Sequence, residues 1–272
     1  MFKQGCLFCW AVVVRFFRED IPMQAAALAY ISLLSIVPLM TVSFSVLAVF
    51  PVFQGLGNRI QEFVFSNFVA SAAQVVQQQL QVFINQTKTL SVPGTFFLLI
   101  AAILVIFAME YAFNKIWRVQ KRRNFMQAFV MYWAVLTLTP ILAGIGFLLS
   151  SYLMSSQFIS VIMKPEIRNV ILTVSPYVFT FLAFVLLYII IPNCRVKVWH
   201  ATVGAIVATI LFELAKYGFT FYIVHFPVYR LVYGALAIIP IFLVWLYLSW
   251  LVVLFGALVS HSVGADLSAP AK

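Results

Sequence analysis

The chain has 272 residues, of which 64% are hydrophobic and only 9% are charged. A soluble domain carries about 45–50% apolar and about 25% charged residues. This composition excludes a soluble enzyme, which would expose large apolar patches. The net charge of +10 suits Lys and Arg in the cytoplasmic loops of a membrane protein better than a nucleic-acid surface, and we expect no nucleic-acid partner.

The chain opens with a short mixed segment and continues with long apolar runs. Residues 1–20 place Trp10 and several Phe beside Lys and Arg, which predicts an amphipathic helix on the cytoplasmic membrane surface. Because a spanning helix needs about 20 apolar residues, six segments qualify. They are approximately Ala27–Val52, Thr95–Trp117, Ala128–Leu153, Val170–Ile191, Val203–Val224 and Ala235–Val259. The sequence therefore predicts an all-α, polytopic membrane helix bundle with about six transmembrane helices and additional amphipathic interfacial helices.

Two further segments are predicted not to span. Residues 54–90 repeat apolar side chains at helical spacing with Gln and Asn on the other face, which predicts outer amphipathic helices. They would form either a lid over a cavity or interfacial padding. Residues 266–272 are expected to be a short tail, and residues 1–265 a single integral membrane domain.

The distribution of basic residues predicts the orientation. With the N-terminus inside, eleven Lys and Arg fall in inner segments and five in outer segments. This positive-inside bias predicts a multi-pass protein of a bacterial inner membrane with both termini in the cytoplasm.

Two sets of ionisable residues fall at membrane depth, where each is a functional hypothesis. Glu110 and Asn114 lie four residues apart on one helix face. They would line a polar cavity open to the cytoplasm, or Glu110 would pair with a nearby base. Glu213 and Lys216 lie three residues apart, and Tyr217 extends their polar stripe. They would form part of a polar path through the bundle, or a self-neutralised pair that fixes helix packing.

The first span carries a candidate cavity or kink. Tyr30, Ser32 and Ser35 precede Pro38, which lacks a backbone N–H and is expected to bend the helix. Plain helix packing explains the same residues.

Small residues at four-residue spacing predict close helix contact. Gly204 is followed by Ala208, and Gly256 by Ser260 and Gly264. The second set permits contact within one chain or between subunits, so a homo-oligomer is one of the two alternatives that the sequence leaves.

No catalytic constellation is evident. The sequence lacks HExxH, GxSxG and GxxxxGK[ST] motifs, and its seven acidic residues are not clustered as a two-metal nuclease requires. We expect no catalytic residues, no metal site and no cofactor, and hence a protein that is not an enzyme.

Four motifs in order resemble one family. They are AAALAYISLLSIVPL from Ala25, NKIWRV from Asn114, FELAKYGFTFY from Phe212 and VYGALAIIPIFLVWLYLSWLVVLFGA from Val232. Together they resemble the YihY/BrkB family of bacterial inner-membrane proteins over about residues 10–262. The resemblance implies a six-helix membrane protein, and it supplies no catalytic residues. Members have carried the labels "ribonuclease BN" and "virulence factor".

We therefore expect a transporter or a translocator of lipids or other amphiphiles. Its partners would be membrane lipids and a lipid-like or small-molecule substrate. The alternative is a non-catalytic membrane scaffold or envelope-assembly partner. A ribonuclease is the weakest hypothesis, because nothing in the sequence would bind metals or activate water.

Overall fold

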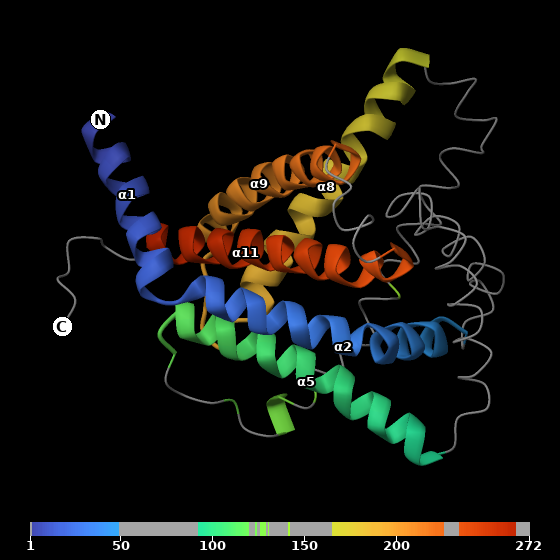
Figure 1. Cartoon of the computed structure of the whole chain (residues 1–272). Coiled ribbons are helices and arrows are strands. Elements are labelled where there is room, and N and C mark those ends of the chain that lie inside the picture. The colour runs from blue at the N-terminus through green and yellow to red at the C-terminus, as the bar shows by residue number, and fades with distance from the viewer. Residues whose placement is uncertain are drawn as a thin grey trace. The chain divides into compact units, whose positions relative to one another are not determined.

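The computed structural model describes residues 2–48, 92–119, 165–225 and 234–264, together with residues 123, 126–128, 130 and 141. Most of these residues are helical and none lies in a strand, which confirms the all-α class (Figure 1). The helices are, in chain order, α1 (Phe2–Arg18), α2 (Ile21–Ala48), α5 (Val92–Ile116), α8 (Pro165–Ile190), α9 (Val198–His225), the 3-10 turn η2 (Gly234–Ala237) and α11 (Ile238–Gly264).

Two helices in the described part are long and apolar enough to cross a membrane. They are Val198–His225, with a mean hydropathy of 1.7, and Ile239–Gly264, with 2.4. At a rise of about 1.5 Å per residue, each exceeds the ~30 Å hydrocarbon core. Three more predicted spans fall on α2, α5 and α8. The span predicted at 128–153 and the interfacial helices at 54–90 lie largely or wholly outside the described residues, so the count of six stays a prediction.

The chain divides into two compact units. The first comprises Met1–Leu33, Phe107–Arg123 and Glu166–Lys272, and the second comprises Leu34–Ile106 and Asn124–Pro165. The first unit therefore contains α1, nearly all of α8, the whole of α9 and α11, the first half of α2 and the last turns of α5. Every polar cluster considered below belongs to this first unit.

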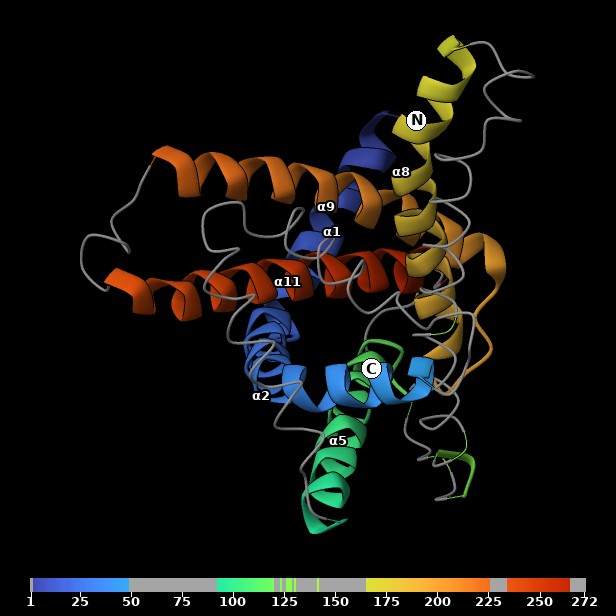
Figure 2. The same ribbon diagram turned by 90° about the vertical axis from the view of Figure 1, so that its right-hand side faces the viewer.

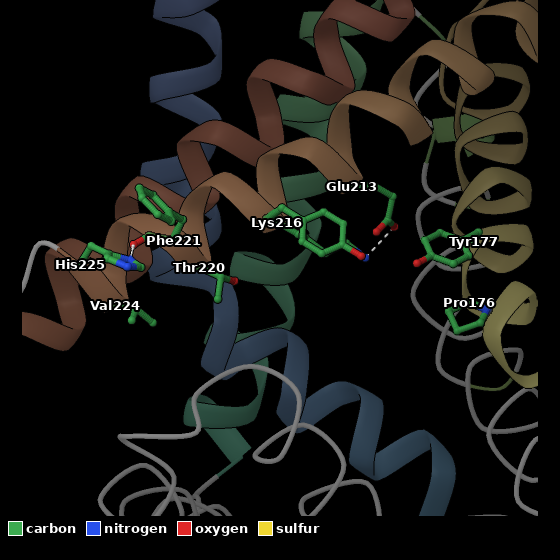
Figure 3. Close-up of a pocket in the computed structure, with 9 residues that line it drawn as sticks. Pro176, Tyr177, Glu213, Lys216, Thr220, Phe221, Val224 and His225 are labelled. Atoms are coloured by element: carbon green, nitrogen blue, oxygen red, sulfur yellow. Dashed lines mark hydrogen bonds and ion pairs between the residues drawn. The ribbon is translucent and has the colours of Figure 1, made fainter.

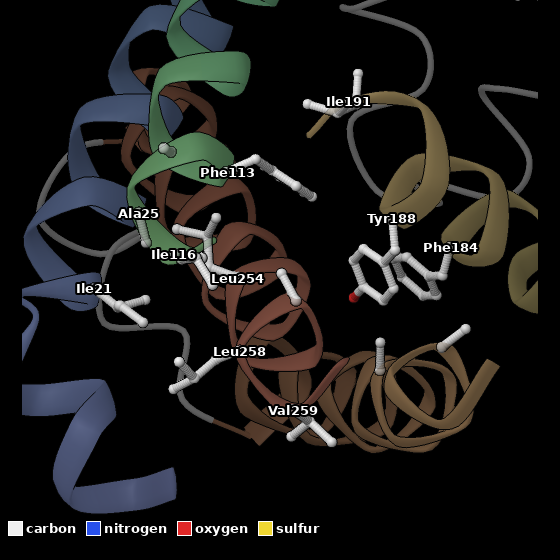
Figure 4. Close-up of a cluster of buried hydrophobic side chains, with 14 of the residues drawn as sticks. Ile21, Ala25, Phe113, Ile116, Phe184, Tyr188, Ile191, Leu254, Leu258 and Val259 are labelled. Atoms are coloured by element: carbon white, nitrogen blue, oxygen red, sulfur yellow. The ribbon is translucent and has the colours of Figure 1, made fainter. Parts of the chain in front are cut away.

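The core of the first unit is built around α11. Leu254 and Leu258 of α11 are fully buried and belong to one apolar cluster with Phe113 of α5 and Tyr188 of α8 (Figure 4). Tyr188 adds a polar tie, because its hydroxyl donates a hydrogen bond of 3.0 Å to the carbonyl of Val253. A buried tyrosine hydroxyl needs such a partner, so this bond fixes α8 against α11.

The small residues at four-residue spacing, Gly204 and Ala208 of α9 and Gly256, Ser260 and Gly264 of α11, form a seam between these two helices within the chain. The two helices lie side by side in both views (Figures 1 and 2). A Cβ at Gly204 would lie 2.5 Å from the carbonyl oxygen of Gly256 and 2.6 Å from the Cβ of Ser260. A Cβ at Gly264 would meet the His200 ring at 2.6 Å. The backbones thus approach too closely for any side chain. The glycines predicted as a contact seam are used inside one chain, which removes them as an argument for an oligomer.

Two helix ends use residues in the left-handed region. Asp20, with φ of 53°, separates α1 from α2, and its carbonyl accepts a 3.2 Å hydrogen bond from Gln24 N–H. Arg118, with φ of 54°, ends α5. Its N–H bonds to Lys115 O and that of Val119 bonds to Asn114 O, which is the Schellman pattern. Both residues are non-glycine, so each turn costs about 1–2 kcal/mol of backbone energy.

The predicted N-terminal amphipathic helix is helix α1. Val12 is buried, and Phe16 packs edge-on against Phe255 of α11 at a ring-centroid distance of 5.5 Å. The opposite side exposes four apolar residues at helical spacing, namely Trp10, Val13, Val14 and Phe17. This exposed stripe is what an interfacial helix would bury among lipid head groups.

Candidate functional site

A hollow of about 580 Å³ lies between α8 and α9 (Figure 3). Helix α8 contributes the first two lining residues and α9 the rest. The lining residues are Pro176, Tyr177, Glu213, Lys216, Tyr217, Thr220, Phe221, Val224 and His225. Charged, hydroxyl-bearing and aromatic groups thus share one open depression on two apolar helices.

An ion pair marks the hollow. Lys216 Nζ lies 2.6 Å from Glu213 Oε1, as the three-residue spacing on one helix predicts. The ammonium also lies 5.6 Å from the ring centroid of Phe212, within cation–π range. The Lys216 side chain is 42% exposed and that of Glu213 only 16%. The carboxylate is therefore the more desolvated partner, and the lysine is the more accessible one.

The two walls offer further polar groups. Figure 3 shows Tyr177 projecting from α8 toward the Glu213–Lys216 pair on α9. Helix α8 continues through Pro176, and the Pro176 carbonyl accepts a 2.9 Å hydrogen bond from the Thr180 hydroxyl. At the far end, the His225 ring stacks on Phe221, and its Nδ1 lies 3.0 Å from the Phe221 carbonyl. The hollow thus grades from a charged end to an aromatic end.

Glu110 belongs to a different cluster, at the end of α5. Its side chain is 7% exposed, and its Oε1 accepts a 3.4 Å hydrogen bond from Asn114 Nδ2. Arg123 Nε lies 3.8 Å from the same oxygen. Arg123 is therefore a basic partner of Glu110, and the cavity and the ion pair both stay predictions for this carboxylate.

Arg123 also holds the loop that follows α8. Its guanidinium donates to Asn193 Oδ1 at 3.1 Å and to the carbonyls of Ile190 and Pro192 at 3.2 and 3.3 Å. The backbone N–H of Asn193 donates to Asn114 Oδ1 at 2.8 Å. The last carbonyls of a helix lack internal partners, so Arg123 caps α8 while it faces Glu110. Neither Arg123 nor Asn193 was among the site residues predicted from the sequence.

A second cluster that sequence analysis missed centres on Arg15. Its guanidinium contacts Glu19 Oε1 at 2.7 Å, His261 Nδ1 at 2.8 Å and the Ile116 carbonyl at 3.0 Å. Arg118 reaches the same Glu19 oxygen at 3.4 Å. Because a guanidinium only donates, His261 Nδ1 accepts here, which assigns a neutral ring with its proton on Nε2. The one local signal was the Arg15–Glu19 spacing of four residues, and the cluster ties α1, α5 and α11 together.

Of the predicted cavity residues of the first span, Tyr30 and Ser32 belong to the first unit and are not among the residues that line the hollow. Ser32 accepts a 3.0 Å hydrogen bond from the indole N–H of Trp250 on α11, which is a packing contact. Ser35 is buried, and Tyr30 is 58% exposed. Helix α2 continues through Pro38.

The residues of the predicted polar path make two separate sets of contacts in the described part of the chain. One set is around Glu110 with Asn114 and the other is around Glu213 with Lys216.

Comparison with known proteins identifies the family to which the chain belongs. A model of the virulence factor BrkB family matches residues 12–270. The chain belongs to this family. It is 43% identical over 251 residues to a UPF0761 membrane protein of Legionella pneumophila (strain Corby), and 44% identical over 243 residues to one of Azotobacter vinelandii. These matches cover 92% and 89% of the chain. The family match confirms the resemblance drawn from the four motifs.

The relatives differ in length from this chain. The chain spans 60% of the Legionella and Azotobacter proteins, and 84% of a UPF0761 membrane protein of Vibrio vulnificus (strain YJ016), to which it is 43% identical over 262 residues. No solved structure matches the chain significantly. The names of the relatives and the two long apolar helices agree that this BrkB-family chain is a membrane protein.

Proposed function

We propose that this BrkB-family chain is a transporter or a translocator of a lipid or other amphiphile, and not an enzyme. The observation that carries the proposal is the hollow between α8 and α9, with the Glu213–Lys216 pair at its charged end. An ion pair at membrane depth is costly unless it serves structure or function. Here it lines open space, where a substrate's polar group can reach it.

The surroundings of the hollow support an amphiphilic substrate. Along α9, Ile210, Leu214, Tyr217 and Phe221 are all more than half exposed and follow each other at helical spacing. An acyl chain can lie on this stripe while the polar group occupies the hollow. In this proposal the chain is multi-pass, crosses a bacterial inner membrane about six times, and has both termini in the cytoplasm, as the eleven inner and five outer basic residues indicate.

A lipid-translocation assay tests the proposal. Purified protein is reconstituted in vesicles of phosphatidylethanolamine and phosphatidylglycerol that contain a tail-labelled fluorescent phospholipid. External dithionite bleaches only the outer leaflet, so translocation appears as loss of the protected fraction. We expect the wild type to remove that fraction. Glu213→Gln should slow the loss about tenfold or more, because a bond to a charged group contributes about 1.5–3 kcal/mol. Thr202→Ala, on α9 but outside the hollow, is the matched control.

A specific observation favours a non-catalytic scaffold as the second candidate. Both intramembrane carboxylates have a basic partner in their own chain, Glu213 with Lys216 and Glu110 with Arg123. In other proteins such pairs have a purely structural role and fix helix packing. The scaffold predicts protected fluorescence in the vesicle assay for wild type and variant alike, together with stable partners that co-purify from the envelope.

A further inference from the structure

The charge balance of the hollow restricts the ligand that it can accept. Glu213 and Lys216 sum to zero, their charged atoms lie 2.6 Å apart, and both groups line the hollow (Figure 3). An anion that draws Lys216 away leaves the carboxylate of Glu213 in a poorly solvated site. A cation that draws Glu213 away leaves the ammonium of Lys216 without its charged partner. Either exchange breaks a pair and strands one charge, which is unfavourable.

A zwitterionic ligand avoids this cost. If its cationic group meets Glu213 while its anionic group meets Lys216, two charge pairs replace one and no charge is stranded. A carboxylate only accepts hydrogen bonds, and an ammonium only donates them. The best match for Glu213 is therefore a primary amine with N–H groups, and the best match for Lys216 is a phosphate. The hydroxyl of Tyr177, which faces the pair, adds a donor for the phosphate.

The size of the hollow indicates how much of the ligand it holds. A volume of about 580 Å³ lies in the range of sites for compact small molecules, which suits a polar head group and leaves long acyl chains outside. Beside it, the exposed stripe Ile210, Leu214, Tyr217 and Phe221 offers an apolar surface for those chains. The charged hollow and the apolar stripe share Tyr217 and Phe221, so one amphiphile can occupy both.

We propose that the hollow between α8 and α9 binds the zwitterionic head group of an amphiphile that carries a primary amine and a phosphate, with the amine against Glu213 and the phosphate against Lys216. This inference rests on the proposed function and specifies the substrate class of the same site. It predicts a preference for zwitterionic over anionic head groups, even though the chain as a whole has a net charge of +10.

Native mass spectrometry of the purified chain tests the preference. Equal amounts of phosphatidylethanolamine, phosphatidylcholine and phosphatidylglycerol with identical acyl chains are offered together. We expect phosphatidylethanolamine adducts to exceed phosphatidylglycerol adducts about tenfold, the factor that one charge-assisted hydrogen bond supplies. Phosphatidylcholine, which lacks N–H groups, should fall between them. Equal adducts, or an excess of phosphatidylglycerol, would overturn the inference, and this comparison needs no variant.

A neutral double variant tests whether the preference for phosphatidylethanolamine arises in the hollow. Glu213→Gln with Lys216→Met removes both charges together, so neither is left unpaired and folding is less at risk than in either single variant. We expect it to bind the three lipids equally. A preference for phosphatidylethanolamine that persists in this variant would show that the head group binds elsewhere.

Two further experiments distinguish a lipid ligand from a free head group, and binding from translocation. Soluble glycerophosphoethanolamine should fail to displace the lipid at matched concentration, because it lacks the acyl chains. Equal displacement would refute the claim that the ligand is an amphiphile. A phosphatidylethanolamine adduct without loss of the protected fraction in the vesicle assay would refute translocation and leave the binding inference standing. Loss of the protected fraction at equal rates for all three head groups, with equal adducts, would leave translocation standing and refute the head-group inference.

Discussion

Replacing Arg123 should destabilise the protein strongly, and the loss should depend on Glu110. Arg123 lies 3.8 Å from Glu110 and donates three hydrogen bonds, one to the last residue of α8 and two to the loop after it. Both side chains are largely buried, at 15% and 7% exposure. Removing one member of such a pair costs about 3–5 kcal/mol. Because 3.8 Å is a long ion-pair distance, we expect Arg123→Met to cost about 3 kcal/mol, with the lost bonds to the loop included.

The dependence on Glu110 appears in a double-mutant cycle. Glu110→Gln alone keeps an acceptor for Asn114 and should cost about 1 kcal/mol. In the Arg123→Met background it should cost less or even stabilise, because it removes the carboxylate that faced the guanidinium. We expect a coupling of about 1–2 kcal/mol between the two substitutions.

Unfolding in mixed micelles, followed by tryptophan fluorescence, measures these free energies. Lys115→Met is the matched control, since Lys115 is an exposed base at the same end of α5, and it should change stability by less than about 0.5 kcal/mol. Additive effects of Glu110→Gln and Arg123→Met within about 0.5 kcal/mol would refute the pairing.

Two other predictions concern the helix seam and the loop after α8. Gly204→Ala should cost about 1–3 kcal/mol of stability, because its Cβ would lie 2.5 Å from the Gly256 carbonyl oxygen. The control Gly218→Ala on the same helix meets nothing within 4 Å and should stabilise by about 0.5–1 kcal/mol. Equal effects of the two substitutions on the melting temperature would contradict the close contact at Gly204. Cys194 is an exposed residue, but partial desolvation of its thiol raises the thiol pKa, so less of it is thiolate at neutral pH. With the other two cysteines replaced by serine, its alkylation rate should keep rising with pH at pH values above the pKa of an ordinary thiol. An impermeant maleimide should reach it only from the cytoplasmic side, and labelling from outside would reverse the predicted orientation.

The sequence determined the class of the protein and its local contacts. A composition of 64% hydrophobic residues requires lipid as solvent, and the long apolar runs located α5, α9 and α11 to within a few residues. The Glu213–Lys216 and Glu110–Asn114 contacts were also predictable, because residues three or four apart on one helix are always neighbours. Such contacts depend on helical spacing alone.

Only the tertiary structure decided which helix faces meet. Arg15 contacts His261 across 246 positions of the chain, and Arg123 contacts Asn193 across 70, and no helical period relates such pairs. The glycine seam was visible in the sequence, yet its use between α9 and α11 within one chain was not. The hollow likewise needs Tyr177 from α8 opposite Glu213 from α9. Spacing along a chain fixes which residues share a face, whereas the packing of several apolar helices selects the faces that touch.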